Sequence, residues 1–297
     1  MKGIEWGKTL TAIVTPMDAS GEIDIPAAVN LARDIIAHGC DGIVVCGTTG
    51  EAATLSTQEK LPLISSLGEE IRGKGLLIAG VGGNCTRDTV GLIRQVEALP
   101  VDGYMVITPY YNKPNQAGLV QHYMAVDAAS TRPIMLYNVP SRTGIDMSRD
   151  DYELVLANCP KITAVKEASA DLAKASWLAA EFPDVDFFSG NDNLTLPLMV
   201  LGFKGVVSVA ANVVPAAMAQ LTALASQGDW EGARHIHEFL SPLFAALFVE
   251  TNPVPVKAAL ELQGWPAGSP RLPLARLSRA NTALLAEVMK NYTREGR

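Results

Sequence analysis

The chain has 297 residues, of which 48% are hydrophobic and 19% charged, and its formal net charge is −7. This composition is that of a globular protein with a large core, and the negative charge argues against a nucleic-acid-binding surface. No apolar run reaches the length of a membrane span, and the first residues lack the apolar core of a signal peptide. The four cysteines are far apart and form no CxxC motif, which favours free thiols over a disulfide scaffold or a zinc site. We therefore expect a cytoplasmic protein without a metal.

Short apolar runs alternate with longer amphipathic ones over the first three quarters of the chain. Eight runs are predicted to be strands, at residues 10–15, 42–46, 76–81, 103–108, 134–138, 162–166, 186–189 and 205–209. The segments between them have the apolar spacing of helices, as in residues 25–38, 58–71, 86–98 and 119–129. Eight alternating units predict a (β/α)8 TIM barrel. The alternative is an open doubly wound sheet, but residues 80–85 do not complete its GxGxxG fingerprint.

The strand pattern stops after about residue 228. Residues 230–249, 256–263 and 274–290 are predicted to be helical, and Asn252-Pro253-Val254-Pro255 interrupts them. We therefore expect two regions. Residues 1–228 form the barrel that carries the active site, and residues 229–297 form a C-terminal helical appendage packed on the barrel.

The sixth predicted strand, Ile162-Thr163-Ala164-Val165-Lys166, ends in a lysine. Apolar surroundings disfavour an ammonium ion, so they lower the pKa of a lysine and make its amine more nucleophilic near neutral pH. A lysine that forms a Schiff base needs this property. The alternative from this segment alone is a lysine whose ammonium extends into solvent.

Other polar residues follow neighbouring strands, and the active site of a TIM barrel lies at these strand ends. The glycine-rich turn of residues 47–51 can hold a carboxylate with its backbone N–H groups. Tyrosines and an arginine follow the fourth and fifth strands. The sequence contains no carboxylate pair suited to glycoside hydrolysis, no clear Ser/His/Asp set and no metal-binding cluster. The combination suits a lysine that forms an imine with a 2-oxo acid, before a carbon–carbon bond forms or breaks.

The chain contains four motifs in order: Gly47-Thr48-Thr49-Gly50-Glu51, Tyr110-Tyr111-Asn112-Lys113-Pro114, Tyr137-Asn138-Val139-Pro140-Ser141-Arg142-Thr143-Gly144 and Val165-Lys166-Glu167-Ala168. With these motifs the whole chain resembles the dihydrodipicolinate synthase family, in the N-acetylneuraminate lyase superfamily of class I aldolases. The resemblance implies condensation of pyruvate with L-aspartate 4-semialdehyde to 4-hydroxy-tetrahydrodipicolinate. This reaction is the first committed step towards diaminopimelate and lysine.

The resemblance implies catalytic roles for four residues. Lys166 forms the Schiff base with pyruvate, and Tyr137 relays protons together with Thr48 and Tyr111. In the family the tyrosine that matches Tyr111 reaches into the neighbouring subunit's site. The catalytic unit is therefore a tight dimer, usually within a homotetramer. The family uses no metal and no organic cofactor.

The resemblance also implies substrate-binding roles. Thr49, with Thr48, holds the pyruvate carboxylate, and Arg142 receives the carboxylate of the semialdehyde. Gly190 and Val207 line the pocket.

Two alternatives to the synthase stay open. Superfamily relatives that cleave N-acetylneuraminate, 2-keto-3-deoxy sugar acids or hydroxy-oxoglutarate share Lys166, Tyr137 and the glycine-rich turn. Arg142 within Pro-Ser-Arg-Thr-Gly favours the synthase over these aldolases. The second alternative is a non-catalytic barrel that binds an oxo acid as a sensor.

Four residues match a regulatory site of the family, where lysine-sensitive members bind two lysines at the tight-dimer interface. Asn84 and Tyr110 match residues that contact the ligand's α-carboxylate and amine. Asp88 stands where sensitive members have a glutamate, and Lys60 stands where they have a histidine facing the ligand's side chain. A second ammonium repels the ε-ammonium of lysine, so we expect weak or absent inhibition by lysine.

Overall fold

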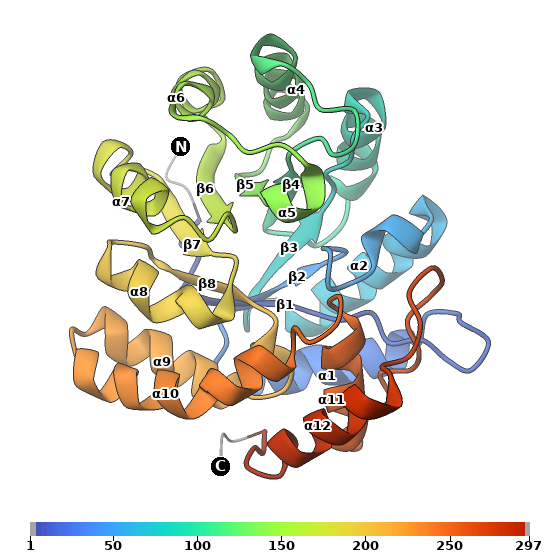
Figure 1. Ribbon diagram of the computed structural model, residues 1–297. Coiled ribbons are helices and arrows are strands. Elements are labelled where there is room, and N and C mark those ends of the chain that lie inside the picture. The colour runs from blue at the N-terminus through green and yellow to red at the C-terminus, as the bar shows by residue number, and fades with distance from the viewer. Residues whose placement is uncertain (1–3, 295–297) are drawn as a thin grey trace.

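The computed structural model describes residues 4–294, in which eight parallel strands close into a barrel (Figure 1). Each strand pairs with its neighbours in chain order, and β8 pairs with β1. The predicted TIM barrel is therefore confirmed. The strands are β1 (Thr9–Ala12), β2 (Gly42–Val45), β3 (Leu76–Gly80), β4 (Gly103–Ile107), β5 (Ile134–Asn138), β6 (Ile162–Glu167), β7 (Asp186–Ser189) and β8 (Gly205–Ser208).

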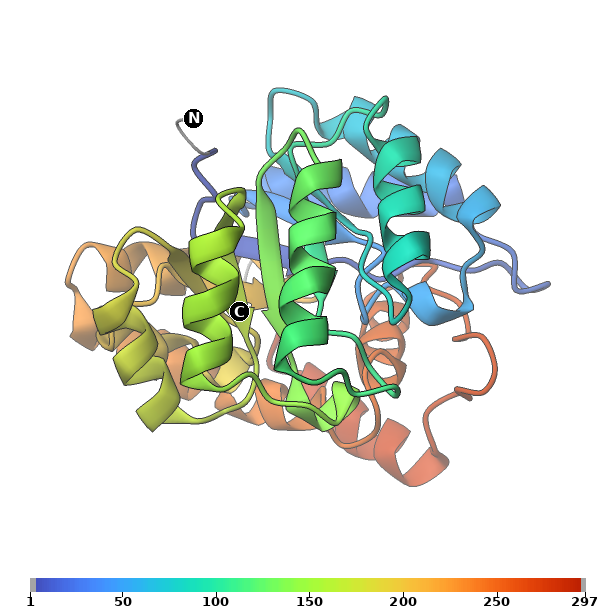
Figure 2. The same cartoon turned by 90° about the horizontal axis from the view of Figure 1, so that it is seen from above.

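Helices follow the strands and form a ring around the barrel. In Figure 2, α3, α4 and α6 lie side by side and run alongside the strands. The ring comprises α1 (Ile25–Ala37), α2 (Thr57–Ile71), α3 (Thr86–Val96), α4 (Gln116–Ala129), α6 (Arg149–Asn158), α7 (Leu172–Glu181), α8 (Thr195–Val200) and α9 (Pro215–Ser226). Short helices at the strand ends are η1 (Ala52–Thr54), α5 (Pro140–Thr143), η2 (Asp192–Leu194) and η3 (Ala210–Asn212). The chain continues in α10 (Trp230–Ala246), α11 (Val254–Leu262) and α12 (Arg279–Met289).

The predicted strands agree with the observed ones within three residues at each end, whereas the last helix differs more. The prediction started this helix at residue 274, but α12 begins at Arg279. The preceding segment is non-helical, and it is attached to the rest of the chain through an ion pair of Arg271 with Glu59 of α2 and a hydrogen bond from the Ser278 N–H to Glu250 Oε1 at 3.1 Å. The side chain of Ser278 then caps the helix by accepting a hydrogen bond from the backbone N–H of Asn281.

The interior of the barrel is filled by side chains rather than open. At the N-terminal end Trp6 is buried, and its indole N–H donates to the Thr163 hydroxyl at 3.1 Å. Large and small residues from alternating strand positions pack above it, which is how the interior of a TIM barrel is normally filled. They are Leu10, Ala12, Val44, Ile78, Met105, Met135, Tyr137, Ala164, Phe188 and Val207.

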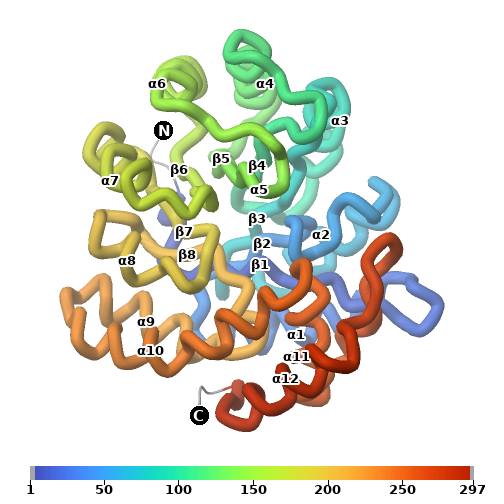
Figure 3. The backbone as a smooth tube through the Cα atoms, viewed as in Figure 1, coloured from blue at the N-terminus to red at the C-terminus, as the bar shows by residue number. Residues whose placement is uncertain are grey.

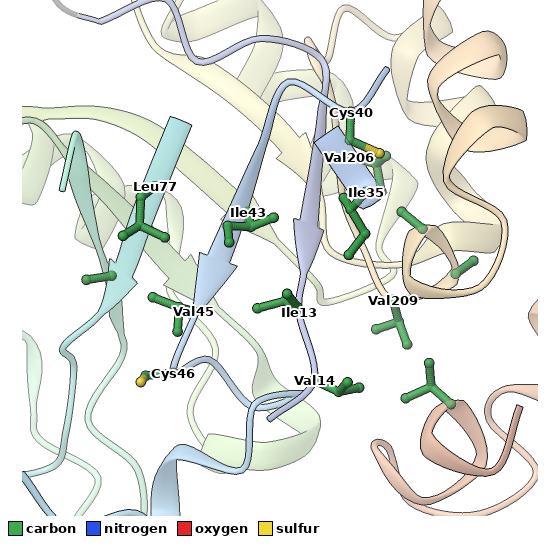
Figure 4. Close-up of a cluster of buried hydrophobic side chains, with 14 of the residues drawn as sticks. Ile13, Val14, Ile35, Cys40, Ile43, Val45, Cys46, Leu77, Val206 and Val209 are labelled. Carbon is green, nitrogen blue, oxygen red and sulfur yellow. The ribbon is translucent and has the colours of Figure 1, made fainter. Parts of the chain in front are cut away.

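A second apolar layer lies between the strands and the helices. Figure 4 shows Ile43 and Val45 of β2 and Leu77 of β3 in this layer, with Ile35 of α1 nearby. Because the strands are buried on both faces, they appear in the sequence as continuous apolar runs. The barrel strands were therefore recognisable from their composition.

The three C-terminal helices pack on one side of the ring, next to α1 and α9 (Figure 3). The segment before α11 and the segment after it reach the C-terminal ends of the barrel strands, where Asn252, Pro253, Pro273 and Leu274 line a cavity. No helix among residues 4–294 is long and apolar enough to cross a membrane.

Candidate active site

Lys166 and Tyr137 lie next to each other at the ends of β6 and β5. They are register partners on these two paired strands, and Lys166 Nζ lies 4.3 Å from the centre of the Tyr137 ring. Ala164 and Ala168 belong to the interior cluster, so strand alternation directs Lys166 into the barrel as well. The lysine is 5% exposed.

Burial is the main influence on the Lys166 amine. It lowers the pKa of Lys166 from 10.5 to about 8, and the positive charge of Arg142 acts in the same direction. The negative charge of Asp192 opposes both. A pKa near 8 leaves an appreciable fraction of neutral, nucleophilic amine at physiological pH.

Asp192 is a buried carboxylate in the turn after β7. It accepts hydrogen bonds from the Ser208 hydroxyl at 2.5 Å and from the backbone N–H groups of Val209 and Ala210 at 3.0 Å. Burial raises the pKa of Asp192, and these three hydrogen bonds oppose that rise. The three hydrogen bonds hold the carboxyl group of Asp192 in place.

The glycine-rich turn after β2 has an unusual backbone. Cys46 and Glu51, at its two ends, have positive φ angles of 53° and 57°, a conformation that is unfavourable for residues other than glycine. A Cβ at Gly80 of β3 would lie 2.3 Å from the Cys46 carbonyl oxygen, so only glycine allows this close approach. The Thr15 hydroxyl donates to the Gly50 carbonyl at 2.7 Å and anchors the turn to the end of β1.

The turn presents two hydroxyls, Thr48 and Thr49, at the barrel mouth. Burial raises the pKa of Tyr137, whereas the charge of Arg142 and a hydrogen bond with Thr48 lower it. Thr48 and Tyr137 are therefore in contact, as a proton relay requires. Thr49 lies deeper and is buried.

Arg142 connects a barrel loop at the mouth with the C-terminal region. It lies on the short helix α5, and its Nη2 donates to the backbone carbonyl of Asn252 at 3.1 Å. The side chain of the same Asn252 donates from Nδ2 to Thr49 Oγ1 at 2.9 Å. A residue of the C-terminal region therefore contacts both predicted carboxylate-binding groups.

A cavity of about 500 Å³ opens at this end of the barrel. Thr48, Tyr137, Arg142 and Asn252 are among the residues that line it. Lys60, Asn84, Asp88 and Tyr110, the four predicted regulatory residues, line the same cavity. The structure thus brings together seven of the residues predicted from the sequence.

Of the two predicted pocket residues, Gly190 directly follows β7 and Val207 lies on β8. Val207 is fully buried inside the barrel. A Cβ at Gly190 would lie 2.5 Å from the Cβ of Ala168, so a larger residue would push against the chain just beyond Lys166.

Tyr111 lies apart from Thr48 and Tyr137, its predicted partners in the proton relay. Its side chain is 88% exposed, its φ is 71°, and it does not line the cavity of its own chain. At this position the Tyr111 side chain is accessible to another chain.

Three contacts at the site were not predicted from the sequence. The sequence marks Asn252 only as part of a segment that interrupts the helices, and it gives Asp192 no predicted role. The third contact is an ion pair between Lys257 Nζ and Glu51 Oε1 at 2.8 Å, and both side chains are 1% exposed. Asparagine beside proline and lysine within a helix are common, so neither residue carried a distinguishing signal.

No group of three or more histidine, cysteine, aspartate or glutamate residues in the part of the chain from 4 to 294 is arranged to hold a metal ion. The groups at the barrel mouth are an amine, phenols, hydroxyls and a guanidinium. They can form an imine, transfer protons and bind carboxylates.

Comparison with protein families identifies a match over nearly the whole chain. The model of the dihydrodipicolinate synthetase family matches residues 5–292. A 4-hydroxy-tetrahydrodipicolinate synthase from Moorella thermoacetica is 46% identical over 288 residues, which cover 97% of this chain and 98% of the relative. The corresponding protein from Thermosynechococcus vestitus is 44% identical, with 96% and 97% covered.

Solved structures of dihydrodipicolinate synthases are similar to this structure over nearly the whole chain. A crystal structure of dihydrodipicolinate synthase from Aquifex aeolicus superposes with a TM-score of 0.94 at 40% identity, covering 96% of this chain and 98% of the other. A dihydrodipicolinate synthase from Cyanidioschyzon merolae with lysine bound gives a TM-score of 0.93 at 40% identity, with 96% and 97% covered. The protein belongs to the dihydrodipicolinate synthetase family.

Proposed function

We propose that the protein is a lyase of the class I aldolase type that condenses pyruvate with L-aspartate 4-semialdehyde. The product is 4-hydroxy-tetrahydrodipicolinate, an intermediate of diaminopimelate and lysine biosynthesis. The observation that carries the proposal is the buried Lys166, whose pKa is lowered to about 8, next to the Tyr137 ring. The family match supports the choice of substrates.

The reaction begins when the neutral Lys166 amine attacks the keto carbon of pyruvate. Loss of water gives an imine, and removal of a methyl proton gives an enamine. The enamine carbon attacks the aldehyde carbon of the semialdehyde and forms the new carbon–carbon bond. The amino group of the semialdehyde then attacks the imine carbon, closes the ring and releases Lys166. Every step needs proton transfer, and we assign it to Tyr137 with Thr48, a role that the hydrogen bond between them supports.

Two carboxylates need separate binding groups. Thr48 and Thr49, with the backbone N–H groups of their turn, bind the carboxylate of pyruvate close to Lys166. Arg142, which lines the same cavity, binds the carboxylate of the semialdehyde. A planar guanidinium suits this role because it can form two parallel hydrogen bonds with a carboxylate.

The proposal includes a homo-oligomer. The exposed position of Tyr111 supports a role in the site of a neighbouring subunit, in a tight dimer that pairs into a tetramer. We further propose that residues 229–297 act as a C-terminal region that completes the barrel mouth, that no cofactor is needed beyond the imine, and that the enzyme works in the cytoplasm.

Reductive trapping tests the chemistry directly. Incubation with pyruvate and borohydride is expected to add one pyruvate-derived mass to the peptide that contains Lys166. Label on Lys161 or Lys113, or no label, would overturn the proposal. The Lys166→Ala variant serves as the control and should take up no label.

A coupled assay tests the second substrate. Pyruvate with aspartate semialdehyde is expected to react much faster than pyruvate with N-acetylmannosamine, sugar-derived aldehydes or glyoxylate. Preference for one of these aldehydes would assign the enzyme to another branch of the aldolases. Imine trapping without turnover on any aldehyde would favour a sensor.

A further inference from the structure

Asn252 contacts both groups to which we assign substrate carboxylates. Its Nδ2 donates to Thr49 Oγ1 at 2.9 Å, and its backbone oxygen accepts from Arg142 Nη2 at 3.1 Å. The residue is 5% exposed and precedes α11, far in sequence from both partners. The contacts therefore connect two barrel loops through one residue of the C-terminal region.

We propose that Asn252 is a positioning residue. It orients the Thr49 hydroxyl towards the pyruvate carboxylate, and it keeps the Arg142 guanidinium at a set distance from that hydroxyl. The inference deepens the proposed function and rests on it.

The direction of the hydrogen bond to Thr49 carries the first part of the argument. A threonine hydroxyl has one hydrogen to donate and lone pairs to accept. Because the Asn252 amide donates to Thr49 Oγ1, the hydroxyl hydrogen of Thr49 remains free for an anion. An acceptor in place of the amide nitrogen would take up that hydrogen.

The amide is kept here despite an energetic disadvantage. Asn252 Oδ1 is buried and has no hydrogen-bond partner among residues 4–294. An unsatisfied buried carbonyl destabilises a fold, whereas an aliphatic side chain of similar size would not. The donor bond to Thr49 is the interaction that an aliphatic residue could not make.

The segment that carries Asn252 is itself firmly anchored. Lys257, in the first part of α11, forms the buried ion pair with Glu51 and donates to the Thr15 carbonyl at 3.1 Å. Glu51 Oε2 also accepts from the backbone N–H of Arg271 at 2.8 Å. Asn252 and Lys257 thus hold the glycine-rich turn at two points, Thr49 and Glu51, so the turn and the segment before α11 act as one unit.

Two substitutions at Asn252 separate positioning from folding. In Asn252→Asp a carboxylate accepts the Thr49 hydrogen and repels the substrate anion. We expect KM for pyruvate to rise by about ten- to a hundredfold, because this is the effect of losing one hydrogen bond to a charged group. KM for the semialdehyde should change by less than about threefold, because the backbone carbonyl still accepts from Arg142. Asn252→Leu removes the donor without adding charge, and it should raise KM for pyruvate less.

A double-mutant cycle with Thr49→Val tests whether the effect passes through the hydroxyl. If it does, Asn252→Leu adds little to KM for pyruvate once the Thr49 hydroxyl is absent. Additive effects on KM for pyruvate would overturn the inference. Equal increases in both KM values with a fall in kcat would also overturn it, because they indicate a general distortion.

Asn281→Asp is the matched control. Asn281 Nδ2 donates to Glu250 Oε1 at 2.7 Å, so this change disturbs the same C-terminal region without touching the barrel mouth. KM for pyruvate should stay at the wild-type value, and an increase equal to that in Asn252→Asp would overturn the inference. Wild-type trapping at Lys166 is measured in parallel. If no trapping occurs, the proposed function is refuted. If trapping occurs but KM for pyruvate is unchanged in the Asn252 variants, only the positioning role is refuted.

Discussion

Tyr137 and Lys166 face each other across two paired strands, and the lysine nitrogen lies 4.3 Å from the centre of the phenol ring. Register pairing between parallel strands fixes the distance between their backbones, and burial fixes the rotamers. The two groups to which we assign proton transfer and nucleophilic attack are therefore positioned before substrate binds. Such preorganisation reduces the entropy lost on reaching the reactive geometry.

The first prediction concerns pH. The neutral amine of Lys166 is the reactive form, so the rate of imine formation with pyruvate should rise with pH through a midpoint near 8 and then level off. Rapid trapping with cyanoborohydride, followed by mass spectrometry, measures this rate. Asp192→Asn removes a charge that raises the pKa of Lys166, so it should move the midpoint to lower pH.

The same shift has a consequence for stability. The pKa of Lys166 is lower in the folded protein than its ordinary value of 10.5. Between the two values the unfolded chain binds more protons at this site, so the free energy of unfolding should rise with pH across this window. A midpoint of imine formation near 10.5 would contradict the predicted effect of burial.

The second prediction concerns the two tyrosines. Tyr137→Phe and Tyr111→Phe should each lower kcat, by about 10²–10⁴-fold for the removal of a general acid–base group. Tyr137→Phe should do so from within its own chain, and Tyr111→Phe from the neighbouring one. Thermal unfolding, measured alongside, should show that both variants keep their fold.

Co-expression of two inactive variants tests the location of Tyr111. A hybrid dimer of Lys166→Ala and Tyr111→Phe chains contains one intact site if Tyr111 acts across the interface. Random pairing should then restore roughly a quarter of wild-type activity, because half the dimers are hybrids with one working site each. If Tyr111 acts within its own chain, the mixture gains nothing over its components.

The third prediction concerns Arg142. Arg142→Ala should raise KM for the semialdehyde far more than KM for pyruvate, because the guanidinium is the group to which we assign the semialdehyde carboxylate. Arg142→Lys keeps the charge but loses the planar donor pair, so it should recover only part of the affinity. Equal changes in both KM values would indicate a structural arginine that supports the Asn252 segment.

The fourth prediction concerns inhibition by lysine. Lys60 lines the cavity with Asn84 and Tyr110. Two unit charges about 5 Å apart repel by roughly 3 kcal/mol at an effective dielectric constant of about 20, before screening. We expect little inhibition by millimolar L-lysine in the wild type and a partial gain in Lys60→His. Strong inhibition of the wild type at sub-millimolar lysine would refute this prediction.

The fifth prediction concerns the buried ion pair. Lys257→Met leaves Glu51 buried without its partner, so the free energy of unfolding should fall by about 3–5 kcal/mol. Adding Glu51→Gln should recover part of this loss, because no unpaired charge remains. Lys290→Met, at an exposed pair with Glu287, is the control and should change little. Denaturant unfolding measures all three, and an equal effect of Lys257→Met and Lys290→Met would contradict the prediction.

The barrel and the position of Lys166 at the end of a buried strand were predictable from local sequence patterns. Parallel strands buried on both faces give continuous apolar runs, and the crossover helices between them give a different period. This alternation predicts eight strand–helix units. It also placed Lys166, Tyr137 and the glycine-rich turn at strand ends that meet at one mouth. These signals are short-range, so the sequence by itself determined them.

The contacts that complete the mouth were decided only by the tertiary structure. Asn252 lies 203 residues from Thr49 and 110 from Arg142, and Lys257 lies 206 residues from Glu51. Contacts over such separations leave no periodicity and no spacing motif. They arise because α11 packs on the barrel and carries the segment before it to the strand ends. Similarly, the left-handed backbone of Tyr111, with a φ of 71°, is not revealed by a tyrosine in the sequence.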